Sequence, residues 1–521
     1  MARIAPLSGF PEQLPADYLV EQAIVDSLRH TFELHGFSGI ETRAVEPVSQ
    51  LLSKGETSKE IYLLSRLQDA APELMDATLR ERRPVPAAES GTPTVETTEG
   101  AAVELVETKA TQRSRREKDQ LGLHFDLTVP FARYVIENAG KLQFPFKRYQ
   151  IQKVWRGERP QEGRFREFIQ ADIDVVGQNA LPAHYEAELP MVMADAFRRL
   201  RKFGVPPVLI LVNNRKVSQG FYQGIGITDV EETLRCIDKL DKIGPDAVAK
   251  LLVETAGATP EQAQACLELA QIRGGIEALA KVQALADKYG ANNELLETGI
   301  NELAALINSA DRQAFISSDA RIGEAWNSPI EIDLKIARGL DYYTGSVYES
   351  VLFGHEDLGS ICSGGRYDSL ASDGKTTYPG VGLSIGVSRL VSRLLRDGIV
   401  QPSRAVPSAV LVAVNAEDQR EDSDAVAALL RKRGIACEVS PTAAKYGKQI
   451  QFAERRGIPY VWFPVAGWFR ERTDQYRHGT TAPEPHQVKD IRTGVQTPAD
   501  PDTWVIPNAD DVKPRILAAN A

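Results

Sequence analysis

The stretch RYQIQKVWRGERPQEGRFREFIQADIDVVG (residues 148–177) decides the fold class of this chain. It reads as two strands joined by a charged loop that contains Pro160 and Gly163. The two-residue period of the second strand predicts an apolar face of Phe165, Ile169, Ala171, Ile173 and Val175 and an opposite face of Arg164, Phe168, Gln170 and Asp174. We therefore expect two paired strands with one side in a core and the other side carrying polar and aromatic groups.

The polar side of these strands has the chemistry of a nucleotide site. Arg156 and Glu158 share a face of the first strand, close to Phe168 of the second. An aromatic ring can stack on a planar base, and guanidinium groups can hold phosphate oxygens with paired hydrogen bonds. The alternative is an ordinary solvated face with surface ion pairs.

Two further segments supply acids and tyrosines. LGLHFDLTVP (121–130) places Asp126 and Thr128 on one face of an extended segment. ARGLDYYTGSVYE (337–349) gathers Arg338, Asp341, Tyr342 and Tyr343. Such tyrosines either donate to a ligand or pack in a core with a satisfied hydroxyl group, and the arginine either binds an anion or pairs with the nearby aspartate.

Two glycine-rich segments complete the pattern. CSGGRYD (362–368) places adjacent glycines, which permit a close approach of the backbone, directly before Arg366 and Tyr367. GLSIGVSRL (382–390) runs from a strand into a helix with Arg389 near the helix start. A cation there opposes the helix dipole, but it fits an anion such as a polyphosphate bound at that end.

Composition excludes several protein classes. The chain has 521 residues, too many for one core, with 43% apolar and 25% charged residues and a net charge of −10. Its four cysteines are widely spaced, which argues against a zinc site and for a reducing compartment. We found no signal peptide and no apolar run of membrane-spanning length, so we expect a cytoplasmic protein. The acidic total argues mildly against a general nucleic-acid coat but leaves local phosphate-binding patches open.

The composition and the predicted secondary structure change several times along the chain. A stretch at 72–118 is rich in Pro, Ala, Glu and Thr and reads as a flexible insertion, either a partner-binding arm or a tolerated surface insertion. After a linker near 397–407, strands and helices alternate to the end. We expect a catalytic domain in two parts (1–206 and 321–400), a helical insertion domain (207–320) and a C-terminal α/β domain (405–521).

The motifs together resemble those of a known enzyme family. RGERPQEGRFREF (156–168) and GLSIGVSRL resemble the second and third motifs of class II aminoacyl-tRNA synthetases. ARGLDYYTGSVYE and CSGGRYD resemble two signatures of histidyl-tRNA synthetases, and KYGKQIQFAERRGIPYV (445–461) and VKDIRTG (488–494) resemble the anticodon-binding domain of that family. Their order and number make coincidence implausible.

This resemblance implies an α+β fold, with an antiparallel catalytic sheet and flanking helices, a helical insertion and a C-terminal α/β anticodon-binding domain. It implies a homodimer that activates L-histidine with ATP and magnesium, releases pyrophosphate, and transfers histidine to the 3′ end of histidine tRNA. No tightly bound cofactor is expected, and the magnesium ligands stay open.

The resemblance also implies roles for individual residues. The ATP-binding set is Arg156 at the α-phosphate, Glu158 at adenine, Phe168 stacked on that ring, and Arg164 and Arg389 at the far end of the triphosphate. The histidine-binding set is Asp126, Thr128 and Gln170 at the α-ammonium, Asp174, Tyr343 and Tyr367 around the imidazole, and Tyr342 without an assigned partner group. Arg338, beside the α-phosphate and the histidine, is the distinctive catalytic cation, together with Arg156.

Transfer RNA contacts are less specific in the sequence. Gln161, in the loop RPQEGR, is the candidate contact for the extra 5′ guanosine of histidine tRNA. Lys445, Lys448, Arg455 and Arg456 form a basic cluster that either faces the anticodon stem or is a solvated helix face. Two positions depart from the family pattern, since Arg43 stands where a proline is usual and His124 where arginine is frequent.

Two other functions compete with the enzyme. A non-catalytic, histidine-sensing regulatory paralogue would keep the fold but typically lacks the anticodon domain and the phosphate-binding arginines. This chain has Arg156, Arg164, Arg338 and Arg389, and its C-terminal domain spans 405–521. A general RNA-binding module would not explain the convergent pocket, and it fits poorly with the acidic total charge.

Overall fold

The computed structural model describes residues 5–52, 60–65, 120–317, 329–337, 343–478 and 484–518. The predicted insertion at 72–118 lies outside these residues. The chain divides into two compact units, Met1–Pro11 with Ser27–Arg199 and Pro206–Leu390, and Glu12–Asp26 with Leu200–Val205 and Val391–Ala521. No helix among the described residues is both long enough and apolar enough to cross a membrane.

The first unit is built on a large sheet. Among the described residues it has nine strands in the order β1-β5-β6-β12-β11-β10-β7-β9-β8. In this order the strands are Ser38–Gly39, Phe146–Trp155, Glu167–Val176, Gly380–Gly386, Cys362–Tyr367, Ser346–Leu352, Val208–Asn214, Ile330–Asp333 and Arg273–Gly274. All pairs are antiparallel except β1 with β5 and β7 with β9. The predicted α+β fold around an antiparallel sheet is confirmed.

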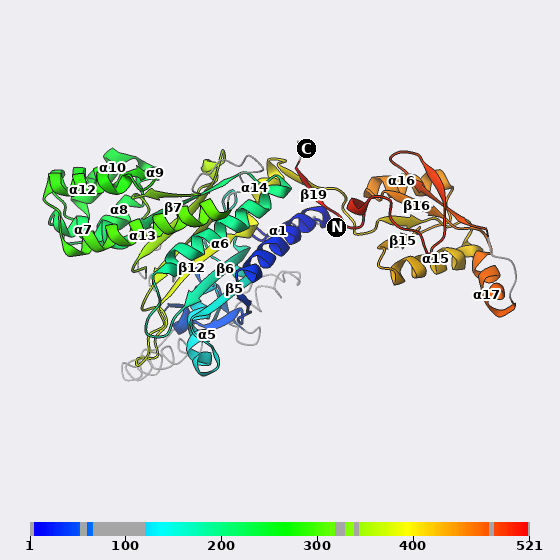
Figure 1. Ribbon diagram of the computed structural model, residues 1–521, viewed down its shortest axis with the longest axis horizontal. Helices are drawn as coiled ribbons and strands as arrows, with labels where there is room; N and C mark the ends of the chain where they lie inside the picture. Colours follow the sequence, from blue (N-terminus) through cyan, green and yellow to red (C-terminus); the bar gives the residue numbers. More distant parts are fainter. Residues whose placement is uncertain are drawn as a thin grey trace, which may run out of the picture. The chain divides into compact units, whose positions relative to one another are not determined.

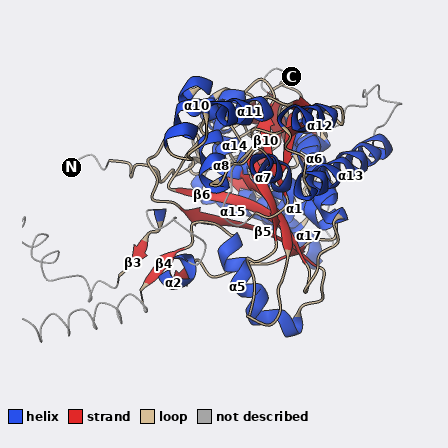
Figure 2. Ribbon diagram, turned by 90° about the vertical axis from the view of Figure 1, so that its left-hand side faces the viewer, coloured by secondary structure: helices blue, strands red, loops and turns tan. Residues whose placement is uncertain are grey.

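The two strands of the deciding stretch, β5 and β6, lie side by side over their full length (Figure 2). Ala171, Ile173 and Val175 are fully buried, as the two-residue period predicts for the apolar face. The assignment of Phe165 to that face was wrong. The strand begins only at Glu167, so the alternation of a strand does not apply to Phe165.

A helix-rich segment lies between β7 and β9 in the chain. Its helices are α7 (Arg215–Gly224), α8 (Val230–Ile237), α9 (Leu240–Ile243), α10 (Pro245–Glu254), α11 (Pro260–Ala270), α12 (Ala278–Tyr289) and α13 (Glu294–Ser317). Thr259 and Gln262 form a reciprocal capping box at the start of α11, which satisfies two backbone groups there. Helices α7 and α13 lie side by side (Figure 1). These helices belong to the same compact unit as the large sheet, and a separate helical domain stays a prediction.

The segment around Asp126 differs from its prediction. Strand β4 is short (Leu121–Leu123), and helix α5 (Thr128–Asn138) begins where an extended segment was expected. The Asp126 carboxylate accepts a hydrogen bond from the Val129 N–H at 3.0 Å, and so satisfies a backbone donor at the helix start. Helix α5 lies beside β5 and β6 (Figure 2), and its apolar residues pack with Val176 and Tyr367.

The remaining elements of the first unit frame the sheet. Strands β2 (Val45–Pro47), β4 and β3 (Leu63–Leu64) form a small antiparallel sheet in the order β2-β4-β3. The other elements, of which α1, α6 and α14 extend into the second unit, are α1 (Pro15–Leu34), α2 (Val48–Leu51), α6 (His184–Leu200), α14 (Val387–Arg396), and the short helices η3 (Ala139–Lys141) and η6 (Glu356–Leu358).

The second unit has the predicted alternation of strands and helices. A five-stranded sheet has the order β15 (Cys437–Val439), β14 (Val410–Val412), β16 (Tyr460–Phe463), β17 (His486–Asp490) and β18 (Gln496–Ala499). The accompanying helices are α15 (Arg420–Lys432), α16 (Tyr446–Arg456) and α17 (Trp468–His478), and the short helices are η4 (Arg201–Phe203), η7 (Glu417–Gln419) and η8 (Ala509–Asp511). Strands β13 (Val400–Pro402) and β19 (Ile516–Ala518) form a separate antiparallel pair. Strand β14 pairs in parallel with both neighbours and is buried throughout, which explains its uninterrupted apolar sequence.

Candidate active site

A cavity of about 260 Å³ opens on the polar face of the large sheet. Its wall comes from the loop between β5 and β6, from strands β6, β10, β11 and β12, and from the start of α14. The lining residues are Arg156, Glu158, Gly163, Arg164, Phe165, Phe168, Gln170, Glu349, Ser360, Ile361, Cys362, Ser363, Ser384, Gly386 and Arg389. All five residues predicted to bind ATP are therefore brought together, with Gln170 beside them.

Arg156 is held in place by contacts within the protein. Its Nε donates to the carbonyl oxygen of Phe125 at 3.0 Å, and its guanidinium carbon lies 5.1 Å from the centre of the Phe168 ring. A cation over an aromatic face is attracted by the ring quadrupole. The guanidinium is thus fixed on two sides within the pocket wall, which is the state that stabilises a developing negative charge without reorganisation.

The loop after β5 is anchored by the N-terminal segment. The Gly9 carbonyl accepts hydrogen bonds from the Arg166 N–H at 2.7 Å and from the Glu167 N–H at 3.1 Å. Gly9 has φ +84°, and a Cβ there would lie 2.8 Å from Arg166 Cγ and 2.9 Å from Pro160 Cγ. Only glycine combines this backbone conformation with this close approach. Since the loop carries charged pocket residues, this anchor sets the shape of one pocket wall.

Charges alternate along that wall. Arg164 Nη1 lies 3.8 Å from Glu158 Oε2, and both side chains are partly exposed, so the pair is loose and can open for a ligand. Arg389 lies in the first turn of α14, as the sequence predicted, and its Nη2 donates to the Leu358 carbonyl oxygen. Three arginines therefore face one cavity, an arrangement that suits a polyphosphate.

Behind the pocket, β5, β6 and β12 align polar residues in rows. Gln152, Gln170 and Gly386 form one row, Gln150, Asp172 and Ser384 the next, and Arg148, Asp174 and Gly382 the third. Only glycine fits at position 382, because a Cβ there would lie 2.1 Å from Asp174 Oδ1 on the neighbouring strand. Gly382 of β12 thus leaves room for Asp174 of β6.

A buried arginine neutralises these acids in part. Arg148 is fully buried, with Nη2 2.7 Å from Asp174 Oδ2 and 3.9 Å from Asp172 Oδ2. Its guanidinium carbon also lies 4.3 Å from the centre of the Phe131 ring. Burial raises the pKa of Asp172 to about 7, because desolvation outweighs the attraction of Arg148 and the negative charge of Asp174 adds to it. Arg148 is therefore paired more closely with Asp174 than with Asp172.

The predicted histidine-binding residues are distributed around these rows. Tyr367 is buried and donates from its hydroxyl group to Asp174 Oδ1 at 2.7 Å. Tyr343 is partly buried and packs close to Gly365, where a Cβ would lie 2.9 Å from Tyr343 Cδ1. Asp126 caps α5, and Thr128 is the first residue of that helix. Arg338 and Tyr342 lie outside the described residues.

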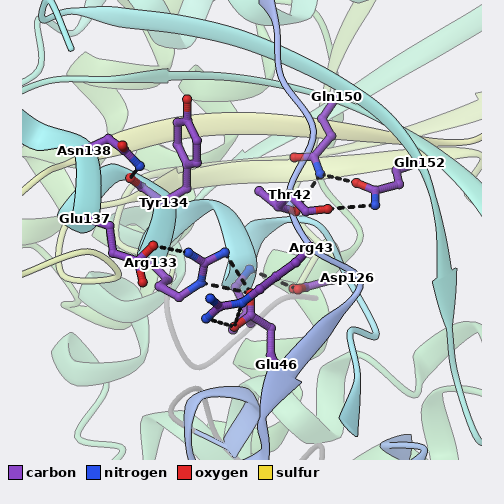
Figure 3. A network of polar contacts seen from close by, with 11 residues as sticks. Thr42, Arg43, Glu46, Asp126, Arg133, Tyr134, Glu137, Asn138, Gln150 and Gln152 are labelled. Carbon is purple, nitrogen blue, oxygen red and sulfur yellow. Dashed lines mark hydrogen bonds and ion pairs between the residues drawn. The ribbon is translucent and has the colours of Figure 1, made fainter. Parts of the chain in front are cut away.

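Figure 3 shows a second polar network, next to Asp126. Glu46 is completely buried and accepts hydrogen bonds from Arg43 Nη2 at 2.9 Å and from Arg133 Nε at 2.9 Å. His124, on the same segment as Asp126, is fully buried, with Nε2 2.7 Å from the Lys153 carbonyl oxygen. Burial lowers the pKa of His124, so this side chain is neutral at pH 7. Arg43 therefore has a structural ion pair at a position where a proline is usual in the resembled family.

The predicted transfer RNA contacts are mostly exposed. Gln161 is exposed, and its backbone exchanges two hydrogen bonds with Arg164 across the loop. Lys445, Lys448 and Arg455 are exposed at or on α16, whereas Arg456 is half-buried and pairs with Glu438 at 3.3 Å. Arg456 is thus less available to a nucleic acid than the other three.

Two pocket residues, Ser384 and Glu349, and the buried Asp172 behind them were missed from the sequence. Ser384 lies on the same face of β12 as the two glycines two residues away on either side, so the two-residue period could have revealed it. The same period places Asp172 with Gln170 and Asp174 on β6. Glu349 lies on β10, at the end of the segment from which only Arg338, Asp341, Tyr342 and Tyr343 were singled out. Within the described part of the chain, no three His, Cys, Asp or Glu side chains form a potential metal site.

Comparisons with known proteins agree with one another. The family model described as histidyl-tRNA synthetase matches residues 91–390. A histidine–tRNA ligase of Bifidobacterium animalis subsp. lactis is 53% identical over 511 residues, covering 97% of this chain and 96% of the relative. A histidine–tRNA ligase of Micrococcus luteus is 51% identical over 520 residues, covering 100% of both chains. The crystal structure of histidyl-tRNA synthetase from Nostoc sp. PCC 7120 has a TM-score of 0.72 and 31% identity, covering 96% of this chain and 98% of that one.

Proposed function

Because the chain belongs to the histidyl-tRNA synthetase family, we propose that it is a histidine–tRNA ligase. The enzyme activates L-histidine with ATP to give histidyl-adenylate and pyrophosphate. It then transfers the histidyl group to the 3′ end of histidine tRNA. The observation that carries this proposal is the single cavity that gathers Arg156, Phe168, Gln170 and Arg389 from segments more than two hundred residues apart.

In this proposal ATP occupies that cavity. Phe168 stacks on the adenine, Glu158 contacts its edge, and Arg156 holds the α-phosphate. Arg164 and Arg389 hold the far end of the triphosphate, and magnesium arrives with the nucleotide. The loose Arg164–Glu158 pair supports this assignment, since a polyphosphate can replace the carboxylate as the partner of Arg164.

The chemical step needs a fixed positive charge. Negative charge builds up around the α-phosphorus as the histidine carboxylate attacks and pyrophosphate leaves. A preorganised guanidinium stabilises that charge without transferring a proton, and arginine keeps its charge at every working pH. We assign this role to Arg156 and Arg338, and the two contacts that hold Arg156 in the pocket wall support its share.

Histidine binds next to the α-phosphate position. Asp126, Thr128 and Gln170 bind its α-ammonium group, and Asp174, Tyr343 and Tyr367 surround its imidazole, with Arg338 and Tyr342 nearby. An imidazole needs hydrogen-bonding partners at both nitrogens, and a site built to supply them rejects apolar amino acids strongly. The contact between the Tyr367 hydroxyl group and Asp174 supports this role, because it orients an acceptor that can serve an imidazole N–H.

The other assignments follow from the family resemblance. They are a homodimer, a cytoplasmic location, the three domains with the bounds given above, a contact of Gln161 with the 5′ end of the tRNA, and contacts of Lys445, Lys448, Arg455 and Arg456 with its anticodon stem. The regulatory alternative is not favoured by any observation, because phosphate-binding arginines line the pocket.

The test is exchange of labelled pyrophosphate into ATP, measured for each amino acid and for the wild type and Arg338→Ala. We expect exchange with histidine alone and its near abolition in the variant. Aminoacylation of histidine tRNA should be lost in parallel. Well-folded protein that binds histidine but shows no exchange would contradict the enzyme and favour the histidine-sensing regulator.

A further inference from the structure

The side-chain amide of Gln170 is bonded on one side and open on the other. Its Nε2 donates to the Ser384 hydroxyl oxygen at 2.6 Å. Its Oε1 is buried and has no hydrogen-bonding partner among the described residues. Both side chains line the cavity, and Gln170 is 7% exposed. A buried acceptor without a partner in a pocket wall is costly unless a ligand supplies the donor.

The orientation of an amide is ambiguous unless its neighbours fix it. Rotating Gln170 by 180° about its last bond would exchange Oε1 and Nε2, and the pocket would then present an NH₂ group. Such a group repels an ammonium ion, whereas a carbonyl oxygen binds it. What lies behind Ser384 therefore decides which amino-acid group this wall can accept.

Asp172 lies behind Ser384. The Ser384 hydroxyl group donates to Asp172 Oδ1, and Asp172 is 2% exposed. The Ser384 hydroxyl group has a single proton, and this proton is directed at Asp172 Oδ1. The Ser384 oxygen is then left with lone pairs alone, which accept only the NH₂ side of Gln170. The relay Asp172–Ser384–Gln170 has one consistent direction.

The surrounding strands hold this relay in register. Asp172 pairs with Ser384 across β6 and β12, and Gln170 pairs in the next row with Gly386, which contributes no side chain from β12. Arg148 stabilises the charged form of the acids from the other side, at 3.9 Å from Asp172.

We propose that Asp172 and Ser384 are positioning residues that fix the Gln170 amide with its carbonyl oxygen toward the pocket, and thereby select an amino acid by its α-ammonium group. This inference rests on the proposed function, which places that group at Gln170. It adds that the selection depends on two residues that need not touch the substrate.

The test compares two ligands that differ only in the group concerned. L-Histidine and 3-(imidazol-4-yl)propionate, its analogue without the α-amino group, are titrated calorimetrically into wild type, Ser384→Ala and Ser384→Thr. We expect Ser384→Ala to weaken histidine binding by about 10-fold or more, the size of one charge-assisted hydrogen bond, and to leave the analogue within about twofold. Ser384→Thr retains the hydroxyl group and should restore histidine binding.

Asp172→Asn gives an independent arm. An asparagine can donate to Ser384, which releases the hydroxyl proton toward Gln170 and makes both amide orientations accessible, so histidine binding should again weaken while analogue binding persists. If this variant fails to fold because Arg148 loses a partner, Ser384→Ala carries the test alone.

The possible outcomes distinguish a failure of the relay from a failure of the proposed function. Equal weakening of histidine and the analogue in Ser384→Ala, or no weakening of either, would overturn the relay and leave the proposed function intact. Failure of the wild type to bind histidine would overturn the proposed function, and the relay with it.

Discussion

The two large sheets of this protein bury different kinds of residues. In the first unit, β5 and β6 place Arg148, Asp172 and Asp174 beneath the cavity, and Gly382 of β12 makes room for Asp174. In the second unit, β14 and β16 pair in parallel and are almost completely buried, with Trp462 at 0% exposure. An antiparallel sheet can leave one face to a site, whereas a parallel sheet covered on both faces is a structural core. The difference predicts that mutations in the two sheets have separable effects.

The largest expected effect is on stability in the second unit. Trp462 packs against Trp504 with ring centres 5.5 Å apart, within a cluster of buried residues around β16. Trp462→Ala should cost about 3–5 kcal/mol of the free energy of unfolding, because a large cavity replaces the ring. Urea unfolding followed by circular dichroism measures this loss. Phe469→Ala, at a side chain 42% exposed on α17, is the control and should cost much less.

If the comparison holds, Trp462→Ala retains pyrophosphate exchange below its unfolding temperature, because the pocket belongs to the first unit. Loss of exchange in folded Trp462→Ala would show that the two sheets are not functionally separable.

The reverse experiment removes a pocket charge. Arg156→Ala should lower histidine-dependent pyrophosphate exchange on the order of 10²–10³-fold, as for removal of a preorganised donor, while the melting temperature changes little. Arg198→Ala is a matched control, since Arg198 is a partly exposed arginine on α6 that pairs with Asp195 at 2.6 Å. Similar losses in both variants would mean that the arginine is needed for general charge and not for the pocket.

Acid should weaken the second unit through His486. Burial lowers the pKa of His486 to about 4 from the ordinary 6.5, and its Nδ1 accepts a hydrogen bond from the Val465 N–H at 2.9 Å. The folded state binds fewer protons than the unfolded state in this range, so stability is constant above pH 6.5 and falls as the pH drops from 6.5 to 4. The loss should approach about 3 kcal/mol at pH 4, from 1.36 kcal/mol per pKa unit.

Comparison with His486→Gln isolates this contribution, because glutamine offers an acceptor to Val465 but does not titrate. The wild type minus the variant should show the slope between pH 6.5 and 4. A pH-independent difference would contradict the assignment.

The last expected effect has the opposite sign and concerns Asp172. Its pKa is raised to about 7 by burial, so the folded state binds more protons than the unfolded state between the ordinary pKa of 3.8 and pH 7. Its contribution to stability therefore decreases as the pH rises through that window and is constant above it. The charged and titratable groups that act on Asp172 are Arg148 on β5, Asp174 on β6 and Asp126 before α5, and Asp172 in turn acts on Cys362 of β11.

The melting temperature of the wild type minus that of Asp172→Asn, followed from pH 4 to pH 8, checks the sign. A difference that grows in favour of the wild type with rising pH would refute it.

The sequence was sufficient to predict features that depend on the local geometry of a single strand or helix. The two-residue period placed Phe168 and Gln170 together in what is now a pocket wall, and the glycine-rich run into α14 placed Arg389 at a helix start. Alternating strands and helices predicted the second unit for the same reason. These features depend only on residues that are close in the chain, so no tertiary information was required.

The tertiary structure decided what depends on register and on helix starts. Asp126 was expected in an extended segment, but its carboxylate caps α5, an alternative that local sequence offers equally well. The contact of Arg148 with Asp174 and the relay from Asp172 through Ser384 to Gln170 join three strands, and β6 and β12 are about two hundred residues apart in the chain. Which residues of distant strands face one another is set by the packing of whole elements, and a shift of one residue would turn every one of these side chains to the other face. The sequence by itself thus determined the kinds of groups in the pocket, and the fold determined which of them meet.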